Sequence, residues 1–519
     1  MTAYLMGIDI GTTGSKALLI DAGGEVIASA MAEHPMYSPK VLWAEQDPED
    51  WWRSAVESVR TSLATSGINP ADISGIGLTG QMHGLVLLDG EGRVLRPCIM
   101  WNDQRTGVEC EEITALLGES KLIEITGKPV LPNFTAPKIS WVRRHEPQVY
   151  EKAAHVLLPK DYIRYRLTGE FFSDVSDASG TSLFDVGGRR WSEEMIGAIG
   201  VERSRLPEVT ESPEVCAKIS SEAARITGLK EGTPVVGGAG DQAAQAVGTG
   251  IIDEGDLSIT LGTSGVLFAS TNDYRTDSDG KIHSYCHASP GKWHFMGVML
   301  SAAGSLRWFR DALGDSEIRT ARDSGKDAYQ IISEEASAIP ACCEGLIFLP
   351  YLTGERTPHA DANARGVFFG LTLRHGKAHM ARAVLEGVSF GLRDSLELMR
   401  ALGLPINECR VSGGGAKSPL WRQILSDNFE TELLTVNNTE GAAYGAALLA
   451  GIGAGIYSSV EEACKTTIRI TGRTSPEAAV KIYREYYQRY RALYPALKQE
   501  FEELTQVAKR FSQPDAGAE

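Results

Sequence analysis

The stretch YLMGIDIGTTGSKALLID, residues 4–21, decides the fold. Two apolar runs flank a Gly-Thr-Thr-Gly turn, a pattern that predicts a strand, a tight turn and a second strand. The same order returns far downstream as DLSIT, LGTSG and VLFAS, over residues 256–270. Two hairpins with nearly the same turn, each early in one half of the chain, indicate a duplicated domain.

Strands and helices alternate around these hairpins. The segment DPEDWWRSAVESVRTSLAT, residues 47–65, starts with an Asp that can cap a helix and a Pro that fits the first helical turn. This alternation predicts an α/β protein with mixed sheets flanked by helices. We expect one domain over residues 1–248, a second over 249–475, and an amphipathic helix over 476–511 that packs on the core.

The face of this last helix is defined by aromatic and apolar side chains at helical spacing. Its members are Tyr483, Tyr487, Tyr490, Tyr494, Leu497, Phe501 and Leu504.

The composition of the chain limits the kinds of partner that it can bind. The 519 residues carry a formal net charge of -16, which argues against a nucleic-acid surface and against an anionic membrane face. The eight cysteines form no CxxC pair, so we expect reduced thiols and a cytoplasmic protein. The apolar window GAAYGAALLAGIGAGI, residues 441–456, is too short to span a bilayer and predicts a tightly packed core helix.

The paired turns are candidates for phosphate binding. A Gly-Thr-Thr-Gly turn presents backbone N–H groups and hydroxyls to a phosphate chain, although a single copy is more simply a hairpin turn. Asp9 lies in an apolar strand, where a hydrated Mg²⁺ that bridges to phosphates would satisfy its carboxylate. The cluster VSGGGAKS, residues 411–418, is either a strand-to-helix turn or a place where a purine approaches the backbone. Together these features predict a two-domain nucleotide binder without a P-loop.

One carboxylate, Asp241, stands in the glycine- and alanine-rich stretch GGAGDQAAQAVGTG, residues 237–250. One interpretation is a helix cap; the other is an active site whose small neighbours leave room for a ligand. The two are compatible, because the dipole at a helix start also favours an incoming phosphate. We expect the helix N-terminus to lower the pKa of Asp241.

Two other patterns are set aside. GIGLTG, residues 75–80, has the spacing of a dinucleotide fingerprint, but QMHGLVLLD after it predicts a strand rather than a helix. His283, Cys286 and His287 lie close together, as zinc ligands do, yet His283 and Cys286 would face opposite sides of a strand.

Several long motifs, in order along almost the whole chain, resemble a known family. GIDIGTTGSK, LGTSG and SGGGAKS are similar to the phosphate and adenosine motifs of the actin-like ATPase superfamily. Within it, LPKDYIRYRLTGE, LPYLTGERTPHADANARGVFFGLT and ARAVLEGVSFGLRDS resemble the FGGY carbohydrate kinases, and LWAEQDPEDWW, GQMHG and WNDQR resemble the bacterial xylulokinases among them. The resemblance implies two duplicated ribonuclease H-like domains with an active-site cleft between them.

The resemblance also implies an activity and a set of site residues. The activity is transfer of the γ-phosphate of ATP, with Mg²⁺, to the C5 hydroxyl of D-xylulose. Asp241 matches the catalytic base and Asp9 the metal-site carboxylate. The sugar contacts match Gln81, Met82, His83, Asp241 and Gln242, and the nucleotide turns match Gly11, Thr12, Thr13, Gly262, Thr263, Ser264, Gly413, Gly414 and Gly415.

One position departs from the narrower pattern, and alternatives stay open. Many xylulokinases have Asn where this chain has Gln242, whereas glycerol kinases have Gln there. Another FGGY kinase, acting on ribulose, gluconate or glycerol, shares every nucleotide motif. A chaperone-type ATPase would need a further β-rich domain, and a sugar sensor would lack Asp9 or Asp241. The expected partners are small molecules, and a homodimer is left open as the assembly.

Overall fold

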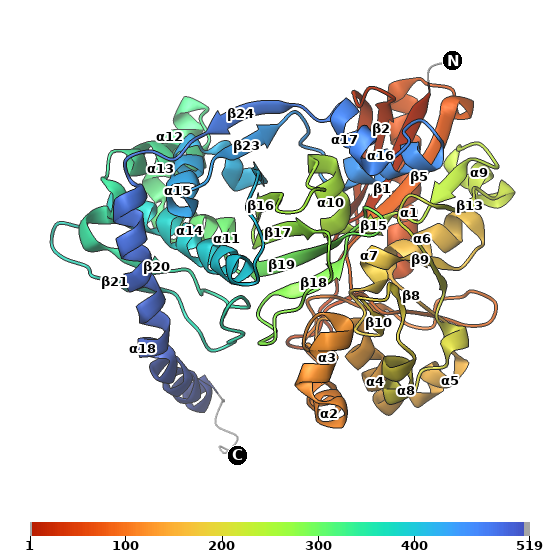
Figure 1. Ribbon diagram of the computed structural model, residues 1–519, viewed down its shortest axis with the longest axis horizontal. Coiled ribbons are helices and arrows are strands. Elements are labelled where there is room, and N and C mark those ends of the chain that lie inside the picture. The colour runs from red at the N-terminus through yellow and green to blue at the C-terminus, as the bar shows by residue number, and fades with distance from the viewer. Residues whose placement is uncertain (1–2, 513–519) are drawn as a thin grey trace. The chain divides into compact units, whose positions relative to one another are not determined.

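The computed structural model describes residues 3–512, which pack into two units (Figure 1). Within that range, unit 1 comprises residues 3–254, 270–295 and 436–469, and unit 2 comprises 255–269, 296–435 and 470–512. The chain therefore returns to unit 1 at Ser270 and again at Val436, whereas the sequence predicts continuous domains over residues 1–248 and 249–475. None of the helices within the described range has the length and apolar character that a membrane span requires.

Unit 1 is built on a seven-stranded sheet in the order β13-β14-β5-β1-β2-β3, with β15 also paired to β5. β1 (Tyr4–Ile10) and β2 (Gly14–Asp21) form the predicted antiparallel hairpin, and β5 (Ile73–Gly80) lies parallel to β1. The remaining strands are β3 (Val26–Glu33), β13 (Val215–Lys218), β14 (Pro234–Val236) and β15 (Ala239–Gly240).

The second hairpin repeats this arrangement. β16 (Leu257–Leu261) and β17 (Gly265–Thr271) are antiparallel, and β22 (Cys409–Ser412) lies parallel to β16. They belong to a sheet in the order β18-β19-β17-β16-β22-β23-β24. Its other strands are β18 (His283–Cys286), β19 (Trp293–Met299), β23 (Leu433–Val436) and β24 (Ile470–Thr474). A hairpin with a parallel third strand occurs in both sheets, which confirms the duplicated mixed-sheet α/β fold.

Helix α1 (Pro48–Ser66) begins as predicted, because the Asp47 side chain accepts a hydrogen bond from the Glu49 amide at 3.0 Å and Pro48 is the first helical residue. The other helices of unit 1 are α2 (Gly107–Leu117), α3 (Glu119–Thr126), α4 (Thr135–His145), α5 (Pro147–Lys152), α6 (Pro159–Thr168), α7 (Val175–Ala178), α8 (Glu193–Ile199), α9 (Ser221–Thr227), α10 (Asp241–Thr249), α16 (Ala442–Gly453) and α17 (Val460–Thr467). Two-stranded ladders join β4 (Glu45–Gln46) to β7 (Cys98–Ile99), β6 (Val86–Leu88) to β8 (His155–Leu157), β9 (Phe172–Asp174) to β12 (Glu208–Thr210), and β10 (Phe184–Asp185) to β11 (Arg190–Trp191).

Helix α16 is the tightly packed core helix predicted from its alanines and glycines. It lies against β1, β2 and β5 (Figure 1) and also contacts α10. A Cβ atom at Gly7 or Gly77 would overlap a carbonyl oxygen of α16, so only glycines in β1 and β5 allow this approach. This close packing places residues 436–469 in unit 1.

The helices of unit 2 surround α14 (Lys377–Ala401), which is buried over much of its length. The others are α11 (Ala303–Leu313), α12 (Asp315–Ser324), α13 (Ala328–Ser337), α15 (Pro419–Phe429) and α18 (Val480–Ser512), and β20 (Ile347–Leu349) pairs with β21 (Val367–Phe369). Short 3₁₀ turns in the two units are η1 (Pro70–Asp72), η2 (Arg203–Arg205), η3 (Ala341–Gly345) and η4 (Gly414–Lys417).

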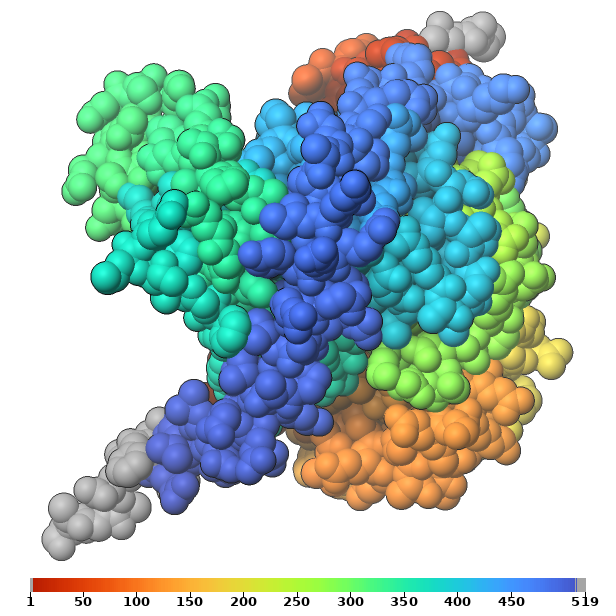
Figure 2. Space-filling view, turned by 60° about the vertical axis from the view of Figure 1, so that its left-hand side comes forward, coloured from red at the N-terminus to blue at the C-terminus, as the bar shows by residue number. Residues whose placement is uncertain are grey.

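Helix α18 is the predicted C-terminal helix; it lies against α14 and α15, and its buried tyrosines bond to α14. The Tyr483 hydroxyl donates to Glu386 at 2.8 Å, and the Tyr487 hydroxyl donates to Asp394 at 2.7 Å. Leu504, expected on the packed face, is instead 59% exposed. The packed face therefore ends at Phe501, and Figure 2 shows the last described turns standing away from the rest of unit 2.

Candidate active site

Three neighbouring strand ends bring the predicted residues of unit 1 together. β1 and β15 both run parallel to β5, and Ile10 and Gly240 both pair in register with Gly80. Because the carboxyl ends of parallel strands meet at one sheet edge, Gln81 and Asp241 leave the sheet side by side. The Gln81 amide also donates to the Ile10 carbonyl at 2.9 Å.

Asp241 is the first residue of α10 and is half-buried. The N-cap residue of α10 is Gly240. The interpretation of Asp241 as the helix cap is therefore wrong by one residue. One carboxylate oxygen accepts a hydrogen bond from the Gln242 amide at 2.7 Å. The helix start therefore holds this carboxylate through a single backbone N–H group.

The pKa of Asp241 is raised, not lowered as the helix position predicts. Burial raises it to about 7, and the negative charge of Asp9 acts in the same direction, while hydrogen bonding from the backbone and the side chain of Gln242 opposes both. The expectation of a lowered pKa is wrong because the loss of solvation outweighs one helix amide. A carboxylate with a pKa near neutrality is an effective general base.

Asp9 lies near the end of β1 with one buried carboxylate oxygen, Oδ1, that has no hydrogen-bond partner within the described residues. Burial raises the pKa of Asp9 to about 6, against the opposing charge of Lys16. Lys16 itself forms an ion pair with Glu440 at 2.7 Å. A buried carboxylate oxygen without a partner is costly unless a cation or a donor contacts it.

The first phosphate-type turn, residues 11–13, is held by hydrogen bonds from two side chains outside it. Its Thr12 carbonyl accepts from Gln46 Nε2 at 2.8 Å, and the Thr12 hydroxyl accepts from Trp101 Nε1 at 3.2 Å. The Thr13 side chain is exposed. The turn is therefore anchored by its carbonyl and one hydroxyl while its outer face remains accessible to a ligand.

Gln46 connects this turn to the predicted sugar loop. It is fully buried, and its Oε1 accepts from Trp51 Nε1 at 3.0 Å and from Gln81 Nε2 at 2.9 Å. An indole N–H can only donate, which fixes the orientation of the Gln46 amide. No spacing pattern singles out Gln46, although it lies within the motif LWAEQDPEDWW.

The predicted sugar loop Gln81–Met82–His83 is buried, and hydrogen bonds hold its conformation. His83 has a left-handed backbone with φ of 71°, and its carbonyl accepts from Lys138 Nζ at 2.8 Å. Its Nδ1 lies 2.8 Å from the Gly180 carbonyl, which only accepts, so this nitrogen carries the hydrogen. Burial lowers the pKa of Lys138 to about 7.

The glycines before Asp241 have a different role from the one expected. Gly238 has φ of 67°, and a Cβ there would overlap the carbonyl oxygen of Leu78 in β5. A Cβ on Gly240 would come within 3.0 Å of the Met82 side chain. These glycines allow the loop to pack against β5 and the sugar loop rather than leaving open space for a ligand.

Unit 2 contains a cavity of about 870 Å³, within the range of small-molecule sites. Gly262 and Thr263 of the second turn line it together with Gly414 and Gly415, whereas Ser264 and Gly413 do not. A Cβ on Gly414 would meet no atom within 4 Å, so a flat ligand can approach its backbone. Gly413 instead supports the turn with φ of 87°.

The second turn is anchored by the start of α11. The Thr263 carbonyl accepts from the amides of Ala302 at 2.9 Å and Gly304 at 3.0 Å. Residues of and before α13 also line the cavity, and sequence reasoning missed them because no motif marks this amphipathic helix. They are Asp327, Tyr329, Gln330, Ser333, Glu334 and Ser337.

The histidines and cysteine that were set aside as a zinc site have protein partners. Cys286 Sγ contacts the Val186 carbonyl at 3.4 Å, and His287 Nε2 contacts the Ile251 carbonyl at 2.9 Å. Within residues 3–512, no group of three or more His, Cys, Asp and Glu side chains is arranged to hold a metal ion.

Repeated hairpins with phosphate-type turns on two mixed sheets flanked by helices, together with a cavity large enough for a small molecule, are the features of a phosphotransferase of the actin-like ATPase fold. The chain belongs to the FGGY family of carbohydrate kinases: the model of the family's N-terminal domain matches residues 4–248, and that of the C-terminal domain matches 257–454. It is an ATP-dependent carbohydrate kinase.

Individual relatives agree with this assignment. The chain is 43% identical to the xylulose kinase of Escherichia coli (strain K12) over 422 residues, 81% of this chain and 84% of that protein. The crystal structure of xylulose kinase from Rhodospirillum rubrum is 31% identical with a TM-score of 0.88, covering 96% of this chain and all of that one. The gluconokinase of Bacillus subtilis (strain 168) is 34% identical over 447 residues, 86% of each chain.

Proposed function

We propose that this kinase transfers the γ-phosphate of ATP to the C5 hydroxyl of D-xylulose and forms D-xylulose 5-phosphate. The observation that carries the proposal is the position of Asp241, a carboxyl with a pKa of about 7, beside the buried loop that contains Met82 and His83. Similarity to xylulose kinases over most of the chain supports D-xylulose as the acceptor. The eight free cysteines support a cytoplasmic location.

Gluconate is the second candidate acceptor, because a gluconokinase is also similar over most of the chain. The two acceptors differ in charge at one end, so a panel of sugars separates them. The loop GQMHG favours D-xylulose, since it resembles the corresponding loop of xylulokinases. Gln242, beside Asp241, is proposed as a further contact to the sugar.

Asp241 accepts the proton of the attacking C5 hydroxyl and holds that oxygen in line with the γ-phosphate. Phosphoryl transfer is largely dissociative, so the enzyme mainly positions the reactants and balances charge. Gln81 and His83 orient the other sugar hydroxyls, and Met82 supplies an apolar contact that excludes water. Proton transfer to Asp241 is favourable near neutral pH because its pKa is close to that of the surrounding solution.

The glycine-rich turns are proposed to hold the nucleotide. Gly11, Thr12 and Thr13 in unit 1, and Gly262, Thr263 and Ser264 in unit 2, contact phosphate oxygens. Gly413, Gly414 and Gly415 line the adenosine side of the 870 Å³ cavity or support it. In both turns the carbonyl groups are engaged by the protein, which orients the turns for phosphate contact.

Asp9 is proposed to hold Mg²⁺ through bound water. Its buried Oδ1 without a partner among the described residues fits such an ion, and magnesium commonly takes only one or two carboxylates from the protein. When bound, the ion offsets the negative charge of the phosphates. Asp9 would thereby hold the positive charge of the ion close to the phosphate-type turn at residues 11–13.

Replacement of Asp241 tests the proposal. Asp241→Ala is expected to lower kcat for D-xylulose by about 10³-fold, because a general base contributes about 10²-fold to 10⁴-fold. ATP affinity, measured by calorimetric titration, is expected to survive because the adenosine cavity lies in unit 2. Full turnover of the variant in a coupled ADP assay would contradict the role of Asp241.

A further inference from the structure

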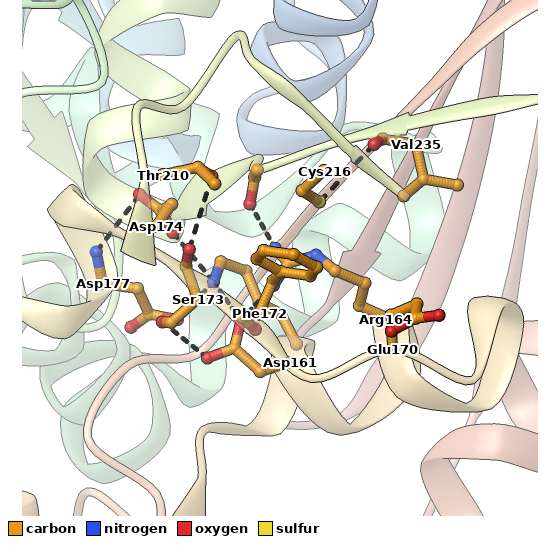
Figure 3. A network of polar contacts seen from close by, with 12 residues as sticks. Asp161, Arg164, Glu170, Phe172, Ser173, Asp174, Asp177, Thr210, Cys216 and Val235 are labelled. Carbon is orange, nitrogen blue, oxygen red and sulfur yellow. Dashed lines mark hydrogen bonds and ion pairs between the residues drawn. The ribbon is translucent and has the colours of Figure 1, made fainter. Parts of the chain in front are cut away.

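A buried charge network, part of which Figure 3 shows, contacts the loop that leads to Asp241. Its members come from α6, β9 and α7 and are at most 1% exposed: Lys160, Asp161, Arg164, Asp174 and Asp177. Lys160 Nζ lies 2.6 Å from Asp161, 2.8 Å from Asp174 and 3.1 Å from Asp177. Arg164 pairs with Asp161 at 2.8 Å. The network is therefore a compact group of three carboxyls and two cations without access to solvent.

The charges of this network balance if one carboxyl is neutral. Burial raises the pKa of Asp177 well above its ordinary value, and the nearby Asp161 and Asp174 act in the same direction, against Lys160. The ion pairs of Lys160 and Arg164 offset the charges of the buried acids and tie α6, β9 and α7 together. Removal of one partner from such a buried group is strongly destabilising.

The network contacts the loop before Asp241 at two points. Arg164 donates to the Gly237 carbonyl, at the start of the loop. At the other end, Ser176 Oγ donates to Asp174 Oδ2 at 2.5 Å and accepts from the Gly240 amide at 3.1 Å. A serine hydroxyl has one hydrogen, and Ser176 donates it in the hydrogen bond to Asp174. A lone pair of the Ser176 oxygen therefore accepts the hydrogen bond from the Gly240 amide. Gly240 is the residue immediately before Asp241.

The same segment also reaches the sugar loop. The Gly180 carbonyl, four residues after Ser176, contacts His83 Nδ1 at 2.8 Å. The Ser179 carbonyl next to it accepts from the buried Lys128 at 2.7 Å. Residues 174–180 therefore contact both the loop that carries the proposed base and the loop that carries a proposed sugar contact.

We propose that Ser176 is a positioning residue for phosphoryl transfer: its hydroxyl, held by Asp174, fixes the Gly240 amide and thereby the place of Asp241 relative to the attacking hydroxyl. The proposal rests on the role of Asp241 given above. Without the hydroxyl, a buried amide loses its acceptor and the first turn of α10 can shift. A displacement of about 1 Å at a reacting group costs about 100-fold in rate.

Ser212 provides a matched control. Its hydroxyl is also fully buried and donates to the same Asp174 Oδ2, at 3.1 Å, but the Gly240 amide bonds to Ser176. The Ser212 backbone carbonyl accepts from Gly238, and an alanine variant keeps that bond. Ser212→Ala therefore disturbs the network to a similar extent without removing the contact to Gly240.

The test compares Ser176→Ala, Ser176→Thr and Ser212→Ala by kcat, both KM values and melting temperature. We expect Ser176→Ala to lower kcat by about 10-fold to 100-fold with an unchanged KM for ATP, Ser176→Thr to recover most of kcat, and Ser212→Ala to stay within about twofold of the parent. Should Ser176→Ala not fold, Ser176→Cys keeps the volume and replaces the hydroxyl by a weak S–H donor, with a similar loss expected.

Equal kcat losses in Ser176→Ala and Ser212→Ala, or an unchanged kcat in Ser176→Ala, would overturn the positioning role. Those outcomes leave the proposed function intact, because the parent enzyme still phosphorylates D-xylulose. Failure of the parent to phosphorylate D-xylulose contradicts the proposed function instead, so the two failures are distinguishable.

Discussion

Asp241 begins helix α10, yet its carboxyl is more basic than that of an ordinary aspartate, because burial and the charge of Asp9 outweigh one backbone amide. The sequence is sufficient to find Asp241 and Asp9, since a carboxylate in a glycine-rich or apolar run is conspicuous. Gln46 and Ser176 are not conspicuous, because a buried polar side chain that bonds to distant loops leaves no spacing pattern. Their partners become neighbours only in the folded chain.

Activity is expected to fall on the acid side of neutrality. With a pKa of about 7, Asp241 becomes protonated as the pH drops, and the protonated carboxyl cannot accept the sugar proton. kcat/KM for the sugar, measured at saturating ATP, should therefore show an acid limb with an apparent pKa of about 7. A flat profile down to about pH 5 would indicate an ordinary aspartate and contradict this environment.

The raised pKa of Asp241 predicts that the protein becomes less stable as the pH rises, although its activity increases. The folded-state pKa of Asp241 lies above its unfolded value, so its stabilising contribution is full below about pH 4 and is lost as the pH rises through about 7. Asp241→Asn should therefore melt at a higher temperature than the parent at about pH 8, while being inactive. A lower melting temperature for the variant at that pH is the contrary result.

Replacement of Gln46 should lower kcat/KM for both ATP and the sugar, because Gln46 forms hydrogen bonds to the phosphate-type turn and to Gln81. Gln46→Leu leaves the Thr12 carbonyl and the Gln81 amide without their partner, at a cost of about 1 to 3 kcal/mol. We expect kcat/KM to fall by about tenfold or more for both ATP and sugar. Gln499→Leu, which changes an exposed glutamine of α18, serves as the control and should leave both values unchanged.

At the scale of elements, the two hairpins, α1, α16 and the final helix are all predictable from turns, caps and hydrophobic spacing. The sequence does not show why glycine is required at individual positions within these elements. Gly7 and Gly77 lie in strands whose sequence pattern is complete without them, and only the approach of α16 explains their lack of a side chain. The exposure of Leu504 is likewise set by where α18 leaves the rest of unit 2, which helical periodicity does not encode.

The contact between α10 and α16 should be sensitive to a single methyl group. A Cβ on Gly445 would overlap the Ala244 carbonyl oxygen in α10. Gly445→Ala is therefore expected to destabilise the protein by about 1 to 3 kcal/mol, through overpacking, and to lower kcat because α10 carries Asp241.

The matched change is Gly197→Ala in α8, where a Cβ would meet no atom within 4 Å. It should raise the free energy of unfolding by about 0.5 to 1 kcal/mol and leave kcat unchanged. Urea titration and the coupled ADP assay measure both effects. Equal stability of the two variants would show that α10 and α16 do not pack as closely as described.

At the scale of the whole molecule, the duplicated α/β fold follows from the repeated hairpin, but the division of the chain does not. Residues 436–469 return to unit 1 because α16 fits against glycine-bearing strands more than 350 residues earlier in the chain. Such long-range packing leaves no local composition change. Because the net charge is -16, an anionic ligand has to be held locally, by backbone amides, a cation or a few placed side chains.

The most direct measurement of the central claim is ATP-dependent phosphorylation by the purified parent enzyme across D-xylulose, D-ribulose, gluconate and glycerol. ADP release gives kcat/KM for each acceptor, and ³¹P and ¹³C NMR of the product locate the new phosphate. We expect the highest kcat/KM for D-xylulose, with the phosphate on C5. A higher value for gluconate, or turnover of none of the four acceptors, would contradict it.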